Sequence, residues 1–422
     1  MALDRKIAPD TLTIEKFAFP DCEKHLTPSG HTIYAVTSSN EEAIKLEIVL
    51  NAGICKQNKN ALAAAANSLM SEGTKLRSSI QIADEMDSFG AYFQTKCLID
   101  DSTITLYCLK KHLNSCLSVI SDFLLNPQYL ESERLIYINN QKERLKVQLE
   151  KTGYLCRKAF YKAVFSETSP IVSFSESIDY DNISRETLIQ FHENHIHKQV
   201  VYIAIAGDVN QEVINTVSNF LNNFNVSERK NSYLQNKAKS ENVVIRKDKS
   251  IQATLRVGGK MINRKHNDYR QLQLANLVLG GYFGSRLMKN IREDKGLTYG
   301  IYSTLESYLD DACFYVEADV NAKKKELVVA EITNELNMLC STNIPEEELN
   351  KAKNYLIGSM LRGIDGPFSL LDRHRILIDY GFEQNYYDDF IEIIKSTTPE
   401  EIRLLTAKYF NPDNLVTVIC GG

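Results

Sequence analysis

The chain of 422 residues has no long apolar run, no excess of basic residues and no C-x-x-C pair. The longest strand-like apolar run, 200–206, is far shorter than the roughly 18 residues of a membrane helix, so we expect no membrane contact. The first residues contain no apolar core of a secretory signal. A formal net charge of -5 argues against nucleic acid as a partner.

The nine cysteines are an odd number, are scattered along the chain and form no metal-binding spacing. This pattern is typical of reduced thiols and excludes both a disulfide framework and a zinc ribbon. No local signature of a catalytic thiol surrounds them. With 43% hydrophobic and 24% charged residues, the composition is that of a globular protein, and we expect it to be cytoplasmic.

Two segments about 210 residues apart follow the same pattern, which indicates an internal repeat. In 183–207 a helix capped by Ser184 leads to an apolar strand that ends in glycine. In 398–422 a helix capped by Thr398, with proline at its first position, leads to another apolar strand and glycine. The chain is therefore predicted to contain two copies of one structural unit.

A second pair of segments, 90–108 and 296–320, supports the repeat, since each has an Asp-Asp pair before an alternating strand. We predict an α+β fold of two homologous halves, each a mainly antiparallel sheet with helices packed on one face. The predicted domains are residues 1–225 and 246–422. Residues 226–245, rich in Asn, Ser and Lys, are the predicted linker.

The segment 60–74, NALAAAANSLMSEGT, resembles the zinc helix of insulinase/pitrilysin-type peptidases, in the branch of the mitochondrial processing peptidases. In that family an inverted H-x-x-E-H precedes a Gly-Thr pair, and its three key positions fall here on Ala64, Asn67 and Ser68. Zinc needs imidazole, thiolate or carboxylate ligands, and none of these three residues supplies one or acts as a base. The resemblance therefore implies a degenerate motif without metal, and it also implies that the two halves form a clam-like chain. The alternative is an alanine-rich packing helix.

A distal glutamate completes the zinc shell in the family, and the helix 136–150 offers Glu143 and Glu150 on one face. Which of them aligns stays open, and a lone carboxylate binds zinc poorly, so we interpret both as surface acids. Three histidines, His192, His195 and His197, lie where a helix gives way to a strand, and we interpret them as structural or solvent-facing. For His374, on a helix rich in charge, we expect a solvated or interface face.

The second half contains LGGYFGSRL at 279–287 and IREDKGLTYG at 291–300, which resemble the family's "GG-x-x-S-S-R-L … R-E-x-x-G-L-x-Y" signature. The resemblance implies that Arg292 and Tyr299 form the Arg–Tyr pair that faces the zinc centre and binds substrate. One alternative is a phosphate-binding loop, whose spacing is absent. The other is that Arg292 forms an ion pair with a nearby carboxylate and that Tyr299 lies in the core. In the first half, residues 93–96 depart from the family's substrate-binding strand.

A motif lost in one half and a signature kept in the other favour a non-catalytic subunit of a heterodimeric zinc peptidase, a pseudoenzyme. The metal-bearing homologous partner would then supply H-x-x-E-H and zinc, this chain would hold no cofactor, and a peptide would be the substrate. A homodimer is possible when the partner is absent. The alternative is a structural or peptide-binding protein without catalysis, as in core subunits of respiratory cytochrome complexes. For an active peptidase with an unconventional metal site, we find no ligand set.

Overall fold

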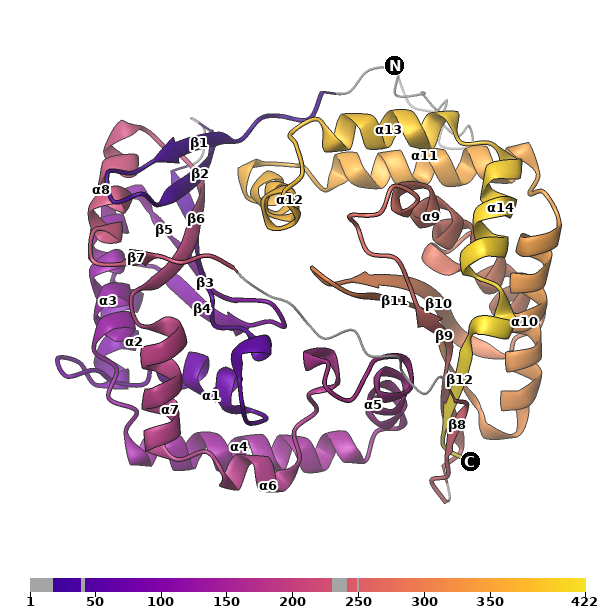
Figure 1. The fold of residues 1–422 in the computed structure, drawn as a ribbon, viewed down its shortest axis with the longest axis horizontal. Coiled ribbons are helices and arrows are strands. Elements are labelled where there is room, and N and C mark those ends of the chain that lie inside the picture. Colours follow the sequence, from indigo (N-terminus) through magenta and orange to yellow (C-terminus); the bar gives the residue numbers. More distant parts are fainter. Residues whose placement is uncertain (1–17, 39–41, 230–240, 249) are drawn as a thin grey trace, which may run out of the picture.

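The computed structural model of the chain describes residues 18–38, 42–229, 241–248 and 250–422. These residues form two lobes, each built from a sheet and a layer of helices, which face each other as the halves of a clam (Figure 1). The predicted α+β class and the two-lobed arrangement are confirmed. Among the described helices, none combines the length and the apolar character that crossing a bilayer requires.

The first sheet has the order β1-β2-β6-β3-β5-β4, with the short β7 paired to β6. Its strands are β1 (Glu23–Leu26), β2 (Thr32–Thr37), β3 (Ala43–Leu50), β4 (Tyr92–Cys97), β5 (Ser102–Leu109), β6 (Gln199–Gly207) and β7 (Asn225–Val226). The pairs of β6 with β2 and with β7 are parallel and the others are antiparallel. The strand β4 is one of the two edges, so its outer backbone groups are open to pairing.

Helices cover one face of this sheet and build the core of the first lobe. They are α1 (Leu62–Leu69), α2 (Ser79–Ser88), α3 (Leu113–Leu125), α7 (Arg185–Phe191) and α8 (Gln211–Leu221). Two further helices of this half, α4 (Glu131–Leu149) and α6 (Ser177–Asp181), pack on each other, and α4 also contacts α1 and α5 (Thr152–Val164). Alternate residues of β3, Ile44, Leu46 and Ile48, point into this core because side chains alternate between faces along a strand. The predicted cap of α7 is confirmed, since the Ser184 hydroxyl accepts a hydrogen bond from the Thr187 amide.

The second sheet has the order β10-β11-β9-β12-β8 and is antiparallel except for the pair of β8 and β12. Its strands are β8 (Val243–Ile245), β9 (Gln252–Lys260), β10 (Thr298–Ser307), β11 (Ala312–Asn321) and β12 (Val416–Cys420). The helices of this lobe are α9 (Tyr269–Asn276), α10 (Lys325–Ser341), α11 (Glu346–Arg362), α13 (Tyr386–Ser396) and α14 (Pro399–Tyr409). Thr398 caps α14 as the sequence predicts.

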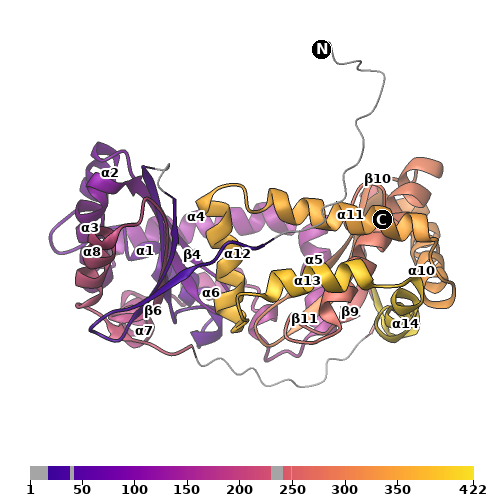
Figure 2. The ribbon, with the colours of Figure 1, turned by 90° about the horizontal axis from the view of Figure 1, so that it is seen from above.

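The two lobes exchange a helix. The helix α5 (Thr152–Val164) comes from the first half of the chain but packs on β9 and β12 of the second sheet. Conversely, α12 (Pro367–Tyr380) comes from the second half and packs on β2 and β6 of the first sheet. In Figure 2 it lies on the side of that sheet opposite to α3 and α8. Each sheet is therefore covered on its second face by a helix from the other half, which the repeat pattern does not predict.

The predicted linker, residues 226–245, falls only partly within the described residues. Its first residue belongs to β7 and its last three form β8, which pairs in the second sheet. Residues 230–240 lie outside the described part of the chain.

Candidate functional site

The helix α1 carries the three positions that correspond to the family's zinc motif. It contacts β4, α4 and α7, and its alanines Ala63, Ala65 and Ala66 are fully buried. Small side chains let a helix lie close to a sheet, so the alanine run has a packing role. Ala64 and Ser68 lie one turn apart on a half-buried face, where two imidazoles would meet in an active family member.

Asn67 links α1 to Ala52, which lies just after the end of β3. Its side chain is 2% exposed, and its Nδ2 donates hydrogen bonds to the carbonyl oxygens of Ala52 at 3.1 Å and Ala63 at 2.9 Å. A neutral amide that donates to two carbonyls has no proton-accepting role near neutral pH. Together with an alanine and a hydroxyl as its neighbours, it is a donor set that does not fit zinc.

We expect Asn67→Ala to lower the free energy of unfolding by about 1–3 kcal/mol, because two buried carbonyls lose their donor. Chemical denaturation of the purified chain measures this effect. Ser68→Ala is the matched control, since Ser68 lies one residue further on the same helix and is half-exposed. An Asn67 variant as stable as the control would show that the amide has no structural role.

The two acids considered as distal ligands lie on the surface of α4. The side chains of Glu143 and Glu150 are 68% and 79% exposed and pair with Lys146 at 2.5 Å and Lys247 at 2.7 Å, respectively. Within the described ranges, no three His, Cys, Asp or Glu side chains lie close enough to hold a metal ion. The interpretation of both glutamates as surface acids is confirmed.

Of the three clustered histidines, His192 is a structural residue of the core. It begins a π-helical turn, His192–Ile196, and is 2% exposed. Its Nε2 lies 3.0 Å from the carbonyl of Leu124 and its Nδ1 lies 2.9 Å from the hydroxyl of Tyr129. The Tyr129 hydroxyl also lies 3.1 Å from the carbonyl of Ala66, so this chain of contacts holds α1 in place.

Burial lowers the pKa of His192 to about 4, below its ordinary value of 6.5. Protons therefore prefer the unfolded chain, and we expect stability to be complete above pH 6.5 and to fall as the pH drops towards 4. The His192 contribution to this loss is about 3 kcal/mol. Denaturation of the wild-type chain and of His192→Leu at several pH values measures it. The variant is expected to lack this part of the pH dependence, and parallel pH profiles would contradict the assignment.

The residues of the Arg–Tyr signature lie at the open edge of the second sheet. Arg292 belongs to the π-helical segment Met288–Asp294, and Tyr299 is the second residue of the edge strand β10. Tyr299 is 92% exposed. The Arg292 guanidinium lies over the Phe283 ring at 4.9 Å from its centroid. In the part of the chain that the structure describes, Arg292 has no ion-pair partner, so both side chains are available to a ligand.

The first glycine of this signature, Gly280, is needed for packing. A Cβ on Gly280 would lie 2.7 Å from the backbone nitrogen of Ser303 on β10, closer than side chains tolerate. The absence of a side chain thus lets the loop that carries Phe283 approach the strand that carries Tyr299.

The expectation for His374 is wrong. The residue is 2% exposed, its Nε2 lies 2.8 Å from the carbonyl of Pro20, and its ring contacts Phe19 with centroids 4.9 Å apart. The reason is the helix exchange, because α12 is covered by the first sheet and by the chain that precedes β1. A helix rich in charge is therefore largely buried.

Sequence reasoning also missed a buried charge network between α12 and the first sheet. Arg375 donates to Glu47 on β3 at 2.7 Å, to the Tyr202 hydroxyl on β6 at 2.9 Å and to Thr103 on β5 at 3.1 Å. Burial opposes ionisation of Glu47, but the positive charges of Arg375 and Lys45 outweigh it and hold its pKa below the ordinary value. The available signal was the presence of Lys45 and Glu47 on a strand that is otherwise apolar.

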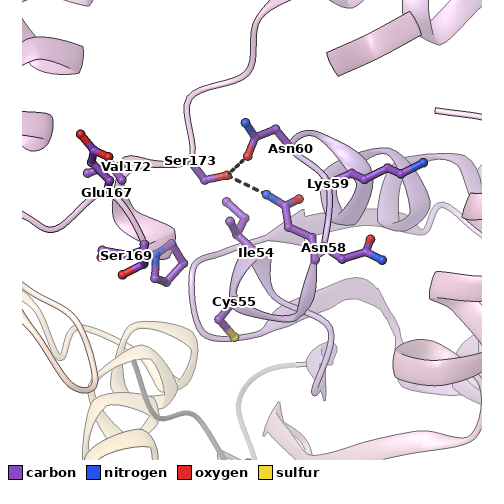
Figure 3. Close-up of a pocket in the computed structure, with 12 residues that line it drawn as sticks. Ile54, Cys55, Asn58, Lys59, Asn60, Glu167, Ser169, Val172 and Ser173 are labelled. Atoms are coloured by element: carbon purple, nitrogen blue, oxygen red, sulfur yellow. Dashed lines mark hydrogen bonds between the residues drawn. The ribbon is translucent and has the colours of Figure 1, made fainter. Parts of the chain in front are cut away.

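A polar pocket of about 420 Å³ lies at the start of α1 (Figure 3). The Ser173 hydroxyl donates to the Asn60 side chain at 2.7 Å and accepts from Gln57 at 2.7 Å, and Gln57 also accepts from the Ala63 amide. The polar side chains of this pocket thus hydrogen-bond to one another and to the first turn of α1. Burial raises the pKa of Cys55 to about 11, so it is a neutral thiol near pH 7 and no nucleophile.

Comparison with known proteins assigns the family. Residues 33–169 match the family model described as Insulinase (Peptidase family M16), and residues 182–356 match the model described as Peptidase M16 inactive domain. The chain belongs to the insulinase family of peptidases. The degenerate α1 and the Arg–Tyr signature of this insulinase-family chain fall in the first and the second matched region, respectively.

Relatives of this insulinase-family chain carry two kinds of description. It is 26% identical over 336 residues to an uncharacterized zinc protease of Rickettsia bellii, covering 78% of this chain and 80% of that protein. It is 24% identical over 355 residues to "Non-peptidase homolog YmxG" of Helicobacter pylori, covering 80% of this chain and 76% of that protein.

Solved structures share the fold. The chain superposes with a TM-score of 0.86 on a peptidase M16 inactive domain from Pseudomonas fluorescens, at 21% identity and with 95% of this chain and 98% of that chain covered. It superposes equally well, at 0.86, on a protease from Helicobacter pylori at 18% identity, with 96% and 100% covered.

Proposed function

We propose that this chain is the non-catalytic subunit of a heterodimeric zinc peptidase of the mitochondrial-processing-peptidase-like type. A homologous partner would carry the H-x-x-E-H helix and the zinc ion, and this chain would form half of the chamber wall. The observation that carries the proposal is the contrast between the two halves. In the first half, Asn67 of α1 binds backbone carbonyls and the positions of the zinc motif offer no metal ligand. In the second half, Arg292 and Tyr299 lie at the edge of the second sheet, where a ligand can reach them.

The exposed Tyr299 and the half-buried Arg292 have the chemistry that peptide cleavage needs from a supporting subunit. A guanidinium and a phenol both donate hydrogen bonds, so they bind a peptide carbonyl and stabilise the oxyanion that forms when it is attacked. The phenylalanine beneath Arg292 orients its guanidinium through a cation–π contact. The neighbouring edge strand β10 offers backbone groups to an extended peptide.

The test compares the chain alone, a homologous chain with an intact H-x-x-E-H alone, and the two mixed. We expect this chain to contain no stoichiometric zinc and to cleave no fluorogenic peptide, while the mixture cleaves faster than the homologous chain alone. Metal analysis and peptide fluorescence report the two results. A zinc-loaded and active single chain would overturn the proposal. Binding of peptide without any gain of cleavage would establish the alternative, a structural or peptide-binding protein.

A further inference from the structure

A cavity of about 320 Å³ is lined by residues of α9, α11, α12, α13 and β10, the edge strand of the second sheet. Figure 1 shows where these elements lie in the fold. Its polar wall contains Arg264, from the loop before α9, and Arg373, from α12. The Arg373 side chain lies against the backbone of Gly363. A Cβ on that glycine would overlap the Arg373 Nη2 atom, so the absence of a side chain makes room for the guanidinium. The exchange of α12 between the lobes thus brings the two guanidinium groups to one cavity.

These two arginines lack a counter-charge. No aspartate or glutamate is among the described residues that line the cavity. Neither Arg264 nor Arg373 has an ion-pair partner in the described ranges, although Arg375 on the same helix pairs with Glu47 and Asp379. The chain as a whole carries a net charge of -5, so acidic side chains outnumber basic ones elsewhere in the molecule. Two uncompensated guanidinium groups in one cavity attract an anion.

A buried aromatic ring adds to the same wall. Tyr386 lines the cavity and is 5% exposed, and its hydroxyl is buried. The Arg270 guanidinium lies over the face of its ring, 4.3 Å from the centroid, and holds the ring in place. Burial raises the pKa of Tyr386, so the phenol keeps its proton and carries no negative charge that would oppose an anion.

The remaining wall is mixed. Its apolar part is formed by Leu277, Leu305, Leu356, Met360 and Phe390. Its polar part is formed by Gln273, Asn276, Ser303, Thr304 and Ser359. A free phosphate would leave the apolar part without a partner, whereas a carboxylate on an apolar body would contact it. The guanidinium fork also matches the two oxygens of a carboxylate.

We propose that this cavity binds a small carboxylate with an apolar body, such as the C-terminal residue of a peptide. Arg264 and Arg373 bind the carboxylate oxygens, and the apolar part of the wall contacts the side chain. The site does not rest on the proposed dimer, because the chain alone contains every residue that it needs.

The test uses the purified full-length chain and three probes: N-acetyl-leucine, its uncharged amide N-acetyl-leucinamide, and inorganic phosphate. Isothermal titration calorimetry and thermal shift measure binding to each. We expect N-acetyl-leucine to bind and to raise the melting temperature, with the amide at least about tenfold weaker, since only the acid has the charge. Binding of phosphate alone would overturn the carboxylate assignment. Equal binding of acid and amide, or no binding of either, would overturn the site.

Variants then locate the binding. Arg373→Gln and Arg264→Gln are each expected to weaken N-acetyl-leucine binding at least about tenfold, because each removes a charged donor. Arg362→Gln is the matched control, since Arg362 ends α11, is exposed and does not line the cavity. Arg373→Lys, which keeps the charge and loses the fork, should bind with intermediate affinity even if a glutamine variant folds poorly. Undiminished binding in the glutamine variants would place the ligand elsewhere.

Discussion

Arg375→Ala is expected to lower the free energy of unfolding by about 3–5 kcal/mol, the scale on which removing one partner of a buried ion pair destabilises a protein. The guanidinium contacts Glu47 at 2.7 Å and Asp101 at 3.4 Å, and both acids are less than one-tenth exposed. Without Arg375 these carboxylates would be buried with less counter-charge. The lost stability would come from the contact between α12 and the first sheet, and this contact links the two lobes.

Denaturation of the wild-type chain, Arg375→Ala and Arg362→Ala measures this effect. Arg362 is the control because it is exposed and lies five residues before α12 begins. Its loss should change stability by less than about 0.5 kcal/mol. Arg375→Lys keeps a charge but cannot reach all three acceptors, so it should fall between the two. If Arg375→Ala is as stable as the control, the network does not hold α12 in place.

Arg292→Ala is expected to slow peptide cleavage by the two-chain mixture by about 10²–10³-fold, the scale of losing one oxyanion donor. The side chain has no partner to stabilise among the described residues apart from the Phe283 ring, so its removal should leave the fold intact. The loss should appear mainly in kcat, since an oxyanion exists only in the transition state. Steady-state kinetics of the mixture, with the partner in excess, measure it.

Lys289→Ala is the matched control, because Lys289 is an exposed cation three residues earlier on the same π-helical segment. It should leave kcat unchanged. Equal titration of both variants into the partner, followed by size-exclusion chromatography, separates a loss of chemistry from a loss of assembly. An Arg292 variant with undiminished turnover would favour the structural alternative over the supporting-subunit proposal.

Local sequence pattern predicted the parts of the fold that depend on neighbours along the chain. The caps at Ser184 and Thr398 and the strands that follow them were readable because a cap needs only the next three residues. The degenerate zinc motif at Ala64 and Ser68 and the Arg–Tyr signature were recognised through their resemblance to the family's motifs, which lie within short stretches of sequence.

The candidate site was less completely predictable. The role of Asn67 depends on the carbonyl of Ala52, which reaches it only because the segment that follows β3 lies against α1. The burial of His374 was missed because the charge pattern of its helix resembles that of a solvated face. In fact the opposite sheet presents Lys45 and Glu47, so the charges are matched across a contact rather than hydrated.

Residue types and short spacings by themselves settled the class of the fold, its repeat and the absence of zinc ligands from α1. Only the tertiary structure decided which helix covers which sheet, and with it the Arg375 network and the cavity of Arg264 and Arg373. The physical reason is range. Alternation and capping are set by the nearest residues, whereas the exchange of α5 and α12 depends on contacts between segments far apart in the chain.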